Sequence, residues 1–168
     1  MSQIAVIYTG GTFDKSYNPK DGSLHFQESF LPQLLTQSRL SQEIQLYPMP
    51  MIDSLEIDES YRQALVDQID LIAEDRILII HGTDTAVETA LYIENTFSDH
   101  SKKIVLTGAM VPSRFQNSDA LFNLGASFQW LNSVNEYGVW LCFHGKSFSP
   151  KDCFKDLKSL QFKEKGPQ

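Results

Sequence analysis

Four short apolar runs recur along the chain, and each has the pattern of a buried strand. They cover residues 4–8, 76–81, 103–107 and 138–143. Their Val, Ile and Leu residues stand at consecutive positions instead of alternating with polar ones. This pattern is typical of strands that are covered on both faces, as in a parallel sheet. A weaker fifth candidate, residues 44–47, is expected to end at Pro48 and Pro50.

Helical periodicity fills the segments between these runs. Helices are predicted over residues 58–73, 84–97 and 118–131, with a shorter candidate at 27–35. The second helix begins with Thr85-Ala-Val-Glu88, which fits a capping box, and the third begins with a Ser-Asp pair. The residues expected to face the core are Tyr61, Leu65, Ile69 and Ile72, then Val87, Ala90 and Leu91, then Leu121, Leu124 and Phe128.

Strands that alternate with helices predict an α/β fold, here a three-layer sandwich with a mostly parallel sheet and helices on both faces. The 168 residues, 42% of them hydrophobic, suit one domain with its own core. We expect this domain to cover residues 1–162, residues 163–168 to form a frayed tail, and no second domain to be present.

Charge and composition narrow the class of partner. The net charge of −7 argues against a nucleic-acid binder, although residues 146–168 hold six Lys against three acidic residues and form a weakly basic tail. We expect no membrane segment, because no apolar run reaches 18 residues, and a cytoplasmic location, because no signal sequence opens the chain. Cys142 and Cys153 are expected to be reduced thiols without a metal role.

Small and hydroxyl residues follow each of the four strand-like runs. The segments are Thr9-Gly-Gly-Thr12, His81-Gly-Thr-Asp-Thr85, Gly108-Ala-Met-Val-Pro-Ser113 and His144-Gly145. Ligands of open parallel sheets bind beyond the carboxyl ends of the strands. The four segments together therefore predict a binding site at that edge of the sheet.

Two of these segments could carry chemistry, and each also has a purely structural interpretation. Thr9-Gly-Gly-Thr12 is either a tight turn or a turn that brings backbone amides and hydroxyls to a ligand. It lacks the third glycine of a GxGxxG motif, and it also lacks the Gly-Lys-Ser/Thr ending of a P-loop. A nucleotide-binding domain is therefore disfavoured. In the second segment, the structural interpretation is that Thr83 or Asp84 caps a helix. The chemical interpretation is that Thr83 is a nucleophile or a proton relay. Thr83 would then need a nearby base, such as a Lys held beside Asp84.

The same segments resemble the bacterial-type L-asparaginase/glutaminase family. Thr9-Gly-Gly-Thr12 after a first strand and His81-Gly-Thr-Asp-Thr85 at a helix start are similar to its two signature motifs. Thr107-Gly-Ala-Met-Val-Pro-Ser113, followed by Ser118-Asp-Ala-Leu-Phe-Asn-Leu124, is similar to a third stretch of the family. The resemblance runs across nearly the whole chain and implies the N-terminal domain fold of that family.

The resemblance implies a set of site residues. Thr12 matches the nucleophile, Thr83 and Asp84 match the second motif, and Lys155 is the best match for the lysine, with Lys151 and Lys158 as alternatives. Tyr17 is similar to the tyrosine of a mobile lid, here a predicted hairpin with Asp21-Gly22 as its turn, although Tyr17 could instead pack on the sheet. The residues expected on the substrate side are Ser54, Gly11, Gly82, Ala109 and Met110; Leu55 stands where the family often has a polar residue.

The implied activity is hydrolysis of the side-chain amide of L-asparagine, or of L-glutamine or a related small amide, to the acid and ammonia, with a threonine nucleophile. The resemblance implies no metal or organic cofactor and a small amino acid as substrate. A homodimer is expected because twofold dimers are the commonest soluble homo-oligomers. Family members usually have a second domain that lends an acidic residue to the substrate amino group, and we expect no counterpart of that residue here. A domain that binds a small amino acid without catalysis is the alternative function.

Three further residues have open interpretations. Arg114 follows the Pro112-Ser113 turn and either reaches a substrate carboxylate or pairs with a surface acid. Asp119 is expected to cap its helix or to order the loop before it. His144, at a strand exit, is either an acid–base group or a structural histidine.

Overall fold

The computed structural model describes residues 3–97 and 101–166. Within them, a six-stranded sheet has the order β4-β1-β5-β6-β7-β8. Its strands are β1 (Ile4–Gly10), β4 (Ile44–Ile52), β5 (Arg76–Ile80), β6 (Lys103–Thr107), β7 (Gly138–Phe143) and β8 (Lys146–Phe148). Neighbouring strands are parallel except for β8, which runs antiparallel to β7. The mostly parallel sheet expected from the apolar runs is confirmed.

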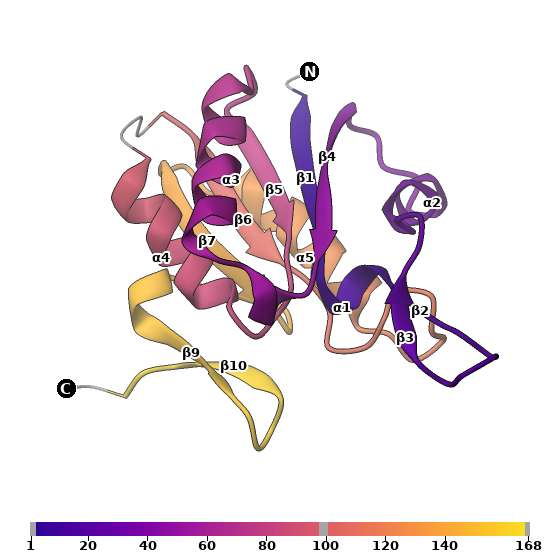
Figure 1. Ribbon diagram of the computed structural model, residues 1–168. Coiled ribbons are helices and arrows are strands. Elements are labelled where there is room, and N and C mark those ends of the chain that lie inside the picture. The colour runs from indigo at the N-terminus through magenta and orange to yellow at the C-terminus, as the bar shows by residue number, and fades with distance from the viewer. Residues whose placement is uncertain (1–2, 98–100, 167–168) are drawn as a thin grey trace.

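Helices cover both faces of this sheet (Figure 1). One face carries α3 (Glu59–Leu71) and α4 (Ala86–Thr96), whose apolar side chains share a core cluster with Ile77, Ile79 and Leu106. The other face carries α2 (Leu31–Gln37) and α5 (Ala120–Ser133), which pack on Val6, Leu78 and Val105 among others. The three-layer α/β sandwich is therefore also confirmed.

The fifth predicted strand is longer than its prolines suggested. β4 continues through Pro48 and Pro50 to Ile52, so the expected end at Pro48 is wrong. In the described part of the chain β4 pairs with β1 alone, at the edge of the sheet. Proline is tolerated at an edge because its missing N–H can face outward, and the pairing register shifts between Tyr8 and Gly10.

Two details of the helix predictions are wrong. Leu121 is 49% exposed, because α5 turns Ala120, Leu124 and Phe128 toward the sheet and leaves Leu121 at the border of that stripe. The side chain of Thr85 occupies the N-cap position of α4 without capping it, since its hydroxyl donates to Ser54 instead. The other core positions of α3 and α5 are buried or partly buried as expected.

Smaller elements gather at the carboxyl end of the sheet (Figure 1). They are the helix α1 (Gly11–Asp14), the 3₁₀ turns η1 (Ser54–Glu56) and η2 (Pro150–Asp152), and two hairpins. The first hairpin joins β2 (Lys15–Tyr17) to β3 (Leu24–Phe26), as predicted, and Gly22 in its turn has a φ of 76°. The second joins β9 (Cys153–Asp156) to β10 (Gln161–Glu164).

The second hairpin includes part of the C-terminal segment that was expected to be frayed. Lys163 and Glu164 pair with Phe154 and Cys153 in the hairpin, so they do not form the frayed tail that was expected. The Lys165 N–H also donates to the Asp152 carbonyl, at 2.7 Å. Residues 167 and 168 of the expected tail lie outside the described residues.

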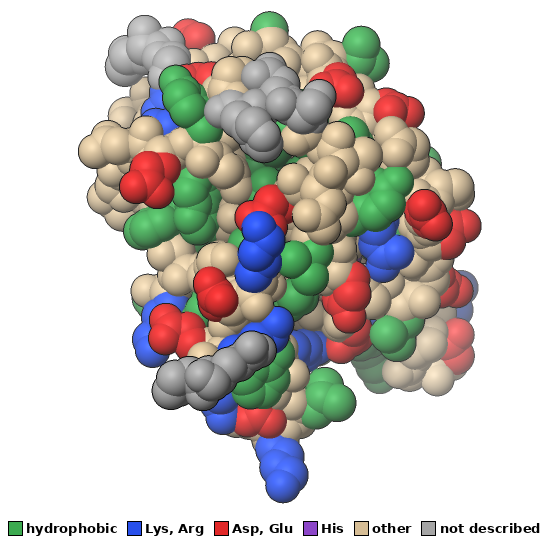
Figure 2. All heavy atoms as spheres, turned by 90° about the vertical axis from the view of Figure 1, so that its left-hand side faces the viewer, with side chains coloured by type: hydrophobic (Ala, Val, Ile, Leu, Met, Phe, Trp, Pro, Cys, Tyr) green, Lys and Arg blue, Asp and Glu red, His purple; other side chains and the backbone are tan. Residues whose placement is uncertain are grey.

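The lysines of this segment do not form a continuous basic surface. Lys151 pairs with Glu94 at 3.2 Å, Lys163 pairs with Asp156, and Lys155 pairs with Asp84. Figure 2 shows basic and acidic side chains interspersed over this side of the molecule. No helix among the described residues is long and apolar enough to cross a membrane.

Candidate functional site

The chain leaves the first strand of the sheet through two glycines with left-handed backbone angles. Gly10 has a φ of 93° and Gly11 a φ of 64°, conformations that residues with a Cβ rarely adopt. The sharp turn starts α1 directly at the end of β1 and leaves Thr12 partly buried at the carboxyl end of the sheet. The position of Thr12 thus depends on the two glycines before it.

Three loops come into close contact at this point, two through their backbones and the third through the Ser54 side chain. A Cβ on Gly11 would lie 2.4 Å from the Cα atom of Gly82, and a Cβ on Gly82 would lie 2.6 Å from Ser54 Oγ. No side chain fits in either gap, so glycine is required where the loops cross. This contact brings the segments that carry Thr12, Thr83 and Ser54 together, although they are far apart in the sequence.

Lys155 completes a polar cluster with the second of these loops. Its Nζ atom donates to Thr83 Oγ1 at 2.7 Å and to Asp84 Oδ1 at 2.6 Å. The Lys155 side chain is only 11% exposed, and Thr83 is buried. An ammonium in this position holds the Thr83 hydroxyl and the Asp84 carboxylate in one place.

The other two candidate lysines lie elsewhere. The Lys151 ammonium pairs with Glu94 of α4, and Lys158 lies in the β9–β10 turn, where its N–H donates to Asp156 Oδ1. Lys155 is thus the one of the three whose ammonium the described structure brings to Thr83 and Asp84. Its place comes from β9, which pairs with β10 in the second hairpin and contacts α4.

Ser54 is buried in a short turn that ends β4. Asp53 stands before it and accepts the Leu55 N–H at 3.1 Å, which caps η1. A hydrogen bond and ion pair from Lys15 hold the pKa of the Asp53 carboxyl below its ordinary value. Ser54 is 2% exposed and is the buried polar residue of this turn, whereas Leu55 is 73% exposed.

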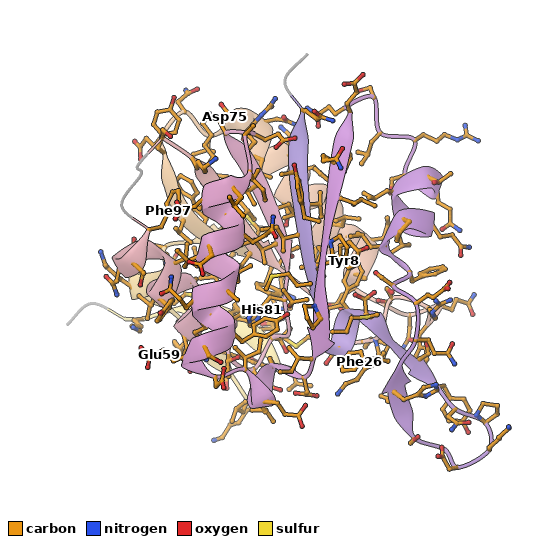
Figure 3. The ribbon with its side chains drawn as sticks, turned by 45° about the horizontal axis from the view of Figure 1, so that its top comes forward. Tyr8, Phe26, Glu59, Asp75, His81 and Phe97 are labelled. Carbon is orange, nitrogen blue, oxygen red and sulfur yellow. The ribbon has the colours of Figure 1, made fainter. Side chains whose placement is uncertain are left out.

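His81 lies under the cluster as a fully buried, neutral side chain. Its Nδ1 atom is 2.7 Å from the Gly82 carbonyl oxygen, which can only accept, so Nδ1 carries the proton. Its Nε2 atom has no hydrogen-bond partner among the described residues. Figure 3 shows His81 at the end of the sheet where Glu59 begins α3, opposite the end that carries Asp75. This hydrogen bond from the His81 ring orients the Gly82–Thr83 peptide.

His81 makes the stability of the fold depend on pH. Burial lowers the pKa of His81 from 6.5 to about 4, whereas an unfolded chain would bind a proton below 6.5. The free energy of unfolding is therefore expected to fall by about 2 kcal/mol between pH 7.5 and pH 5, and further until about pH 4. Urea unfolding at both pH values measures this loss, and His81→Asn, which does not titrate, is expected to reduce it. An equal loss of unfolding free energy in His81→Asn would show that His81 is not the source of the pH dependence.

The loop after β6 is held by Asp119, the N-cap residue of α5, and by Asn123 within that helix. Asp119 accepts the N–H groups of Met110 and Val111 at 2.9 and 3.0 Å, so it orders this loop, as one of its two interpretations proposed. Asn123 is fully buried, donates to the Gly108 carbonyl at 3.0 Å and accepts the His144 N–H at 2.9 Å. Ala109 is buried and Met110 partly buried in the resulting wall.

The structure does not bring Tyr17 to the polar cluster. Tyr17 is 55% exposed on the β2–β3 hairpin, so the interpretation that it packs on the sheet is wrong. The base of the hairpin is firmly held: Asp14 Oδ1 accepts Ser29 Oγ at 2.7 Å. Arg114 donates to the Glu28 carbonyl at 3.0 Å and lies over the ring of Phe30, and it forms no ion pair with an acidic side chain among the described residues.

Sequence comparison identifies the family. A family model described as "Asparaginase, N-terminal" matches residues 3–160. The chain belongs to the asparaginase N-terminal family. L-asparaginase 1 of Escherichia coli K12 is 29% identical over 128 residues, which make up 72% of this chain and 38% of that protein. Glutaminase-asparaginase of Pseudomonas aeruginosa is 33% identical over 94 residues, 53% of this chain and 25% of the relative.

Solved structures agree with the fold of this asparaginase domain. L-asparaginase I from Vibrio cholerae superposes with a TM-score of 0.85 at 21% identity and covers 99% of this chain. The probable cytoplasmic L-asparaginase from Campylobacter jejuni has a TM-score of 0.80 at 27% identity and covers 92%. The chain spans 52% and 48% of these two structures, and 38% of the Escherichia coli relative.

The asparaginase domain also contains polar contacts that the sequence interpretation did not assign. Lys15, Thr85 and Asn123 each join two loops of the site through their side chains. The spacing of Asp119 and Asn123 places both on one helix face and is a signal that could have found that pair. Lys15 and Thr85 act across 38 and 31 residues of sequence, and no local pattern reveals such contacts.

Proposed function

We propose that this asparaginase domain hydrolyses the side-chain amide of L-asparagine, or of L-glutamine or a related small amide, to the acid and ammonia. The observation that carries the proposal is the contact of Lys155 Nζ with Thr83 Oγ1 and Asp84 Oδ1 beside the loop of Thr12. A binding module has no need of a buried lysine held against a hydroxyl. A hydroxyl nucleophile does need a nearby base. The names of the relatives, L-asparaginase and glutaminase-asparaginase, agree with this substrate class.

In the proposed first step the Thr12 hydroxyl attacks the amide carbon. The new C–O bond forms as the carbonyl π electrons move to oxygen, and backbone N–H groups of the Gly10-Gly11 turn stabilise that oxyanion. The hydroxyl proton passes through Thr83 to Lys155 Nζ, which accepts it after its ammonium has released a proton to solvent. Asp84 holds that amine in place and stabilises the ammonium that results.

Collapse of the tetrahedral intermediate then breaks the C–N bond. The proton held by Lys155 returns through Thr83 to the leaving nitrogen, which departs as ammonia and leaves an ester on Thr12. Water attacks this ester with the same relay as base, and the acid and the free Thr12 hydroxyl are regenerated. Ser54 is proposed to bind the substrate α-carboxylate, with Gly11, Gly82, Ala109 and Met110 forming the walls of the site. Tyr17 is proposed to reach Thr12 when the hairpin closes.

We also propose that the protein acts in the cytoplasm as a homodimer. The likeness to a probable cytoplasmic asparaginase supports the location. Closed twofold dimers are the commonest assemblies of identical chains, which supports the oligomeric state. Analytical ultracentrifugation is expected to give twice the chain mass of 19.1 kDa, and a monomer at micromolar concentration would overturn this part.

The test of the activity is ammonia release by the purified protein from L-asparagine and L-glutamine. Replacement of either threonine by alanine is expected to lower the rate by at least about 10²–10⁴-fold, because Thr12→Ala removes the nucleophile and Thr83→Ala removes the hydroxyl that passes the proton on. Thr36→Ala is the matched control, since Thr36 is exposed on α2 and bonds only locally, to the Pro32 carbonyl.

Two outcomes would contradict the proposal. Ammonia release that survives both threonine substitutions would exclude the assigned site. A protein that releases no ammonia from either amide, yet binds L-aspartate, would instead support a domain that recognises amino acids without catalysis.

A further inference from the structure

The turn that carries Ser54 is too short to hold its own position. It consists of the single 3₁₀ turn η1, with local backbone hydrogen bonds from Glu56 to Asp53 and from Ile57 to Ser54. Yet Ser54 is 2% exposed and packs directly on Gly82, next to the Thr83 cluster. Contacts from outside the turn must therefore set where the Ser54 hydroxyl lies.

The first such contact comes from the loop after β5. Thr85 Oγ1 donates to the Ser54 carbonyl oxygen at 2.7 Å. Thr85 stands at the N-cap position of α4, where a hydroxyl usually accepts a backbone N–H of the first turn and stabilises the helix by about 1 kcal/mol. The helix forgoes this bond. A local rule that is broken in this way indicates that the hydroxyl has a role in the site.

The second contact comes from the other side, from the segment that carries Thr12. Lys15 begins β2, three residues after Thr12, and its ammonium forms an ion pair with Asp53. Asp53 is the residue that caps η1, and its side chain is 29% exposed while that of Lys15 is 22% exposed. Because both groups are largely shielded from solvent, the pair is screened less than an ordinary surface ion pair.

We propose that Thr85 and Lys15 are positioning residues that hold Ser54 at a fixed place relative to Thr83 and Thr12, and so set the affinity for the α-carboxylate of an amino-acid substrate. This inference rests on the proposed function. Neither side chain takes part in the chemistry. Together they join the turn of Ser54 to the two loops that carry the reacting groups, so that one substrate meets both ends of the site in register.

The kinetic test uses two substitutions of Thr85 that differ in the hydroxyl. Thr85→Val keeps the shape but loses the donor, and it costs α4 nothing because the hydroxyl does not cap the helix. We expect KM for L-asparagine to rise about 5–10-fold with kcat within about twofold, which corresponds to one lost hydrogen bond. Thr85→Ser keeps the donor and is expected to restore KM. An equal rise of KM in both variants, or a fall of kcat alone, would overturn the role of Thr85.

The role of Lys15 is tested by Lys15→Met, with Lys20→Met as the matched control in the exposed turn of the same hairpin. Isothermal titration with L-aspartate is expected to give a several-fold higher Kd for Lys15→Met and Thr85→Val than for the original protein and for Lys20→Met. Unchanged aspartate affinity in both variants would overturn the proposal.

Hydrogen exchange separates this proposal from the proposed function. Without any ligand, the amides of Glu56 and Ile57 are expected to exchange faster in Thr85→Val and Lys15→Met, because η1 loses an anchor in each. Amides of β6 serve as the internal reference. Unchanged exchange at Glu56 and Ile57 would overturn the positioning role even in an active enzyme, whereas faster exchange in a protein without activity would contradict only the proposed reaction.

Discussion

Replacing Lys155 by methionine is expected to lower ammonia release by about 10²–10⁴-fold, the range for removal of an acid–base group. Methionine keeps much of the length and apolar bulk of the lysine side chain but can neither donate to Thr83 nor pair with Asp84. The Asp84 carboxylate is 39% exposed, so water can solvate it after the ammonium is lost, and the fold is expected to persist. The measurement is ammonia release from L-asparagine, with circular dichroism to verify the fold.

Two neighbouring lysines provide matched controls for this experiment. Lys151→Met and Lys158→Met each remove one positive charge from the same segment, yet neither ammonium contacts Thr83 or Asp84 in the described structure. Both variants are expected to keep the activity within about twofold, since surface ion pairs contribute little. A large loss in Lys158→Met with none in Lys155→Met would show that the lysine had been assigned in the wrong register.

Arginine is expected to fail as a replacement for Lys155. Its guanidinium keeps the charge and could pair with Asp84, but it does not lose a proton under ordinary conditions. A Lys155→Arg variant that retains the original rate would indicate that the site needs only a positive charge at this place. The proton relay through Thr83 would then be excluded.

The sheet was predictable from sequence because its signal is local. Runs such as residues 76–81 are apolar at consecutive positions, and that pattern by itself indicates a strand covered on both faces. The end of β4 was missed, because whether Pro48 ends a strand depends on its position at the edge of the sheet. The exposure of Leu121 was missed for a related reason: a stripe of helix positions has borders, and only the packing of α5 on β6 and β7 decides which side is buried.

The site was predictable in its residue types and less so in its contacts. The hydroxyls and glycines that follow the strands are visible as motifs, and the parallel strands bring them together at the carboxyl end of the sheet. Three lysines remained open, because β9 and β10 are four-residue strands with little apolar periodicity. The contacts of Thr85 and Lys15 join loops through single polar atoms, which hydrophobic periodicity does not report.

Substitution of Gly82 by alanine is expected to damage the site, because the added methyl group would collide with Ser54. The new Cβ would lie 2.5 Å from Ser54 Cβ and 2.6 Å from Ser54 Oγ, well inside van der Waals contact. Ser54 is buried in η1, directly against Gly82, so the two loops must move apart. We expect a loss of about 1–3 kcal/mol in the free energy of unfolding, as for other overpacked sites. We also expect a fall of about 10²-fold in ammonia release, because the reacting loops shift relative to each other.

Gly125→Ala is the matched control, because it adds the same methyl group where nothing lies within 4 Å, on the exposed face of α5. Alanine stabilises a helix interior by about 0.5–1 kcal/mol over glycine, so this variant is expected to be slightly more stable and fully active. Urea unfolding and ammonia release measured on both variants separate the two sites. If Gly82→Ala behaved like Gly125→Ala, the close contact between the loops of Thr83 and Ser54 would not exist in solution. The positioning of Ser54 by its neighbours would then lose its structural basis.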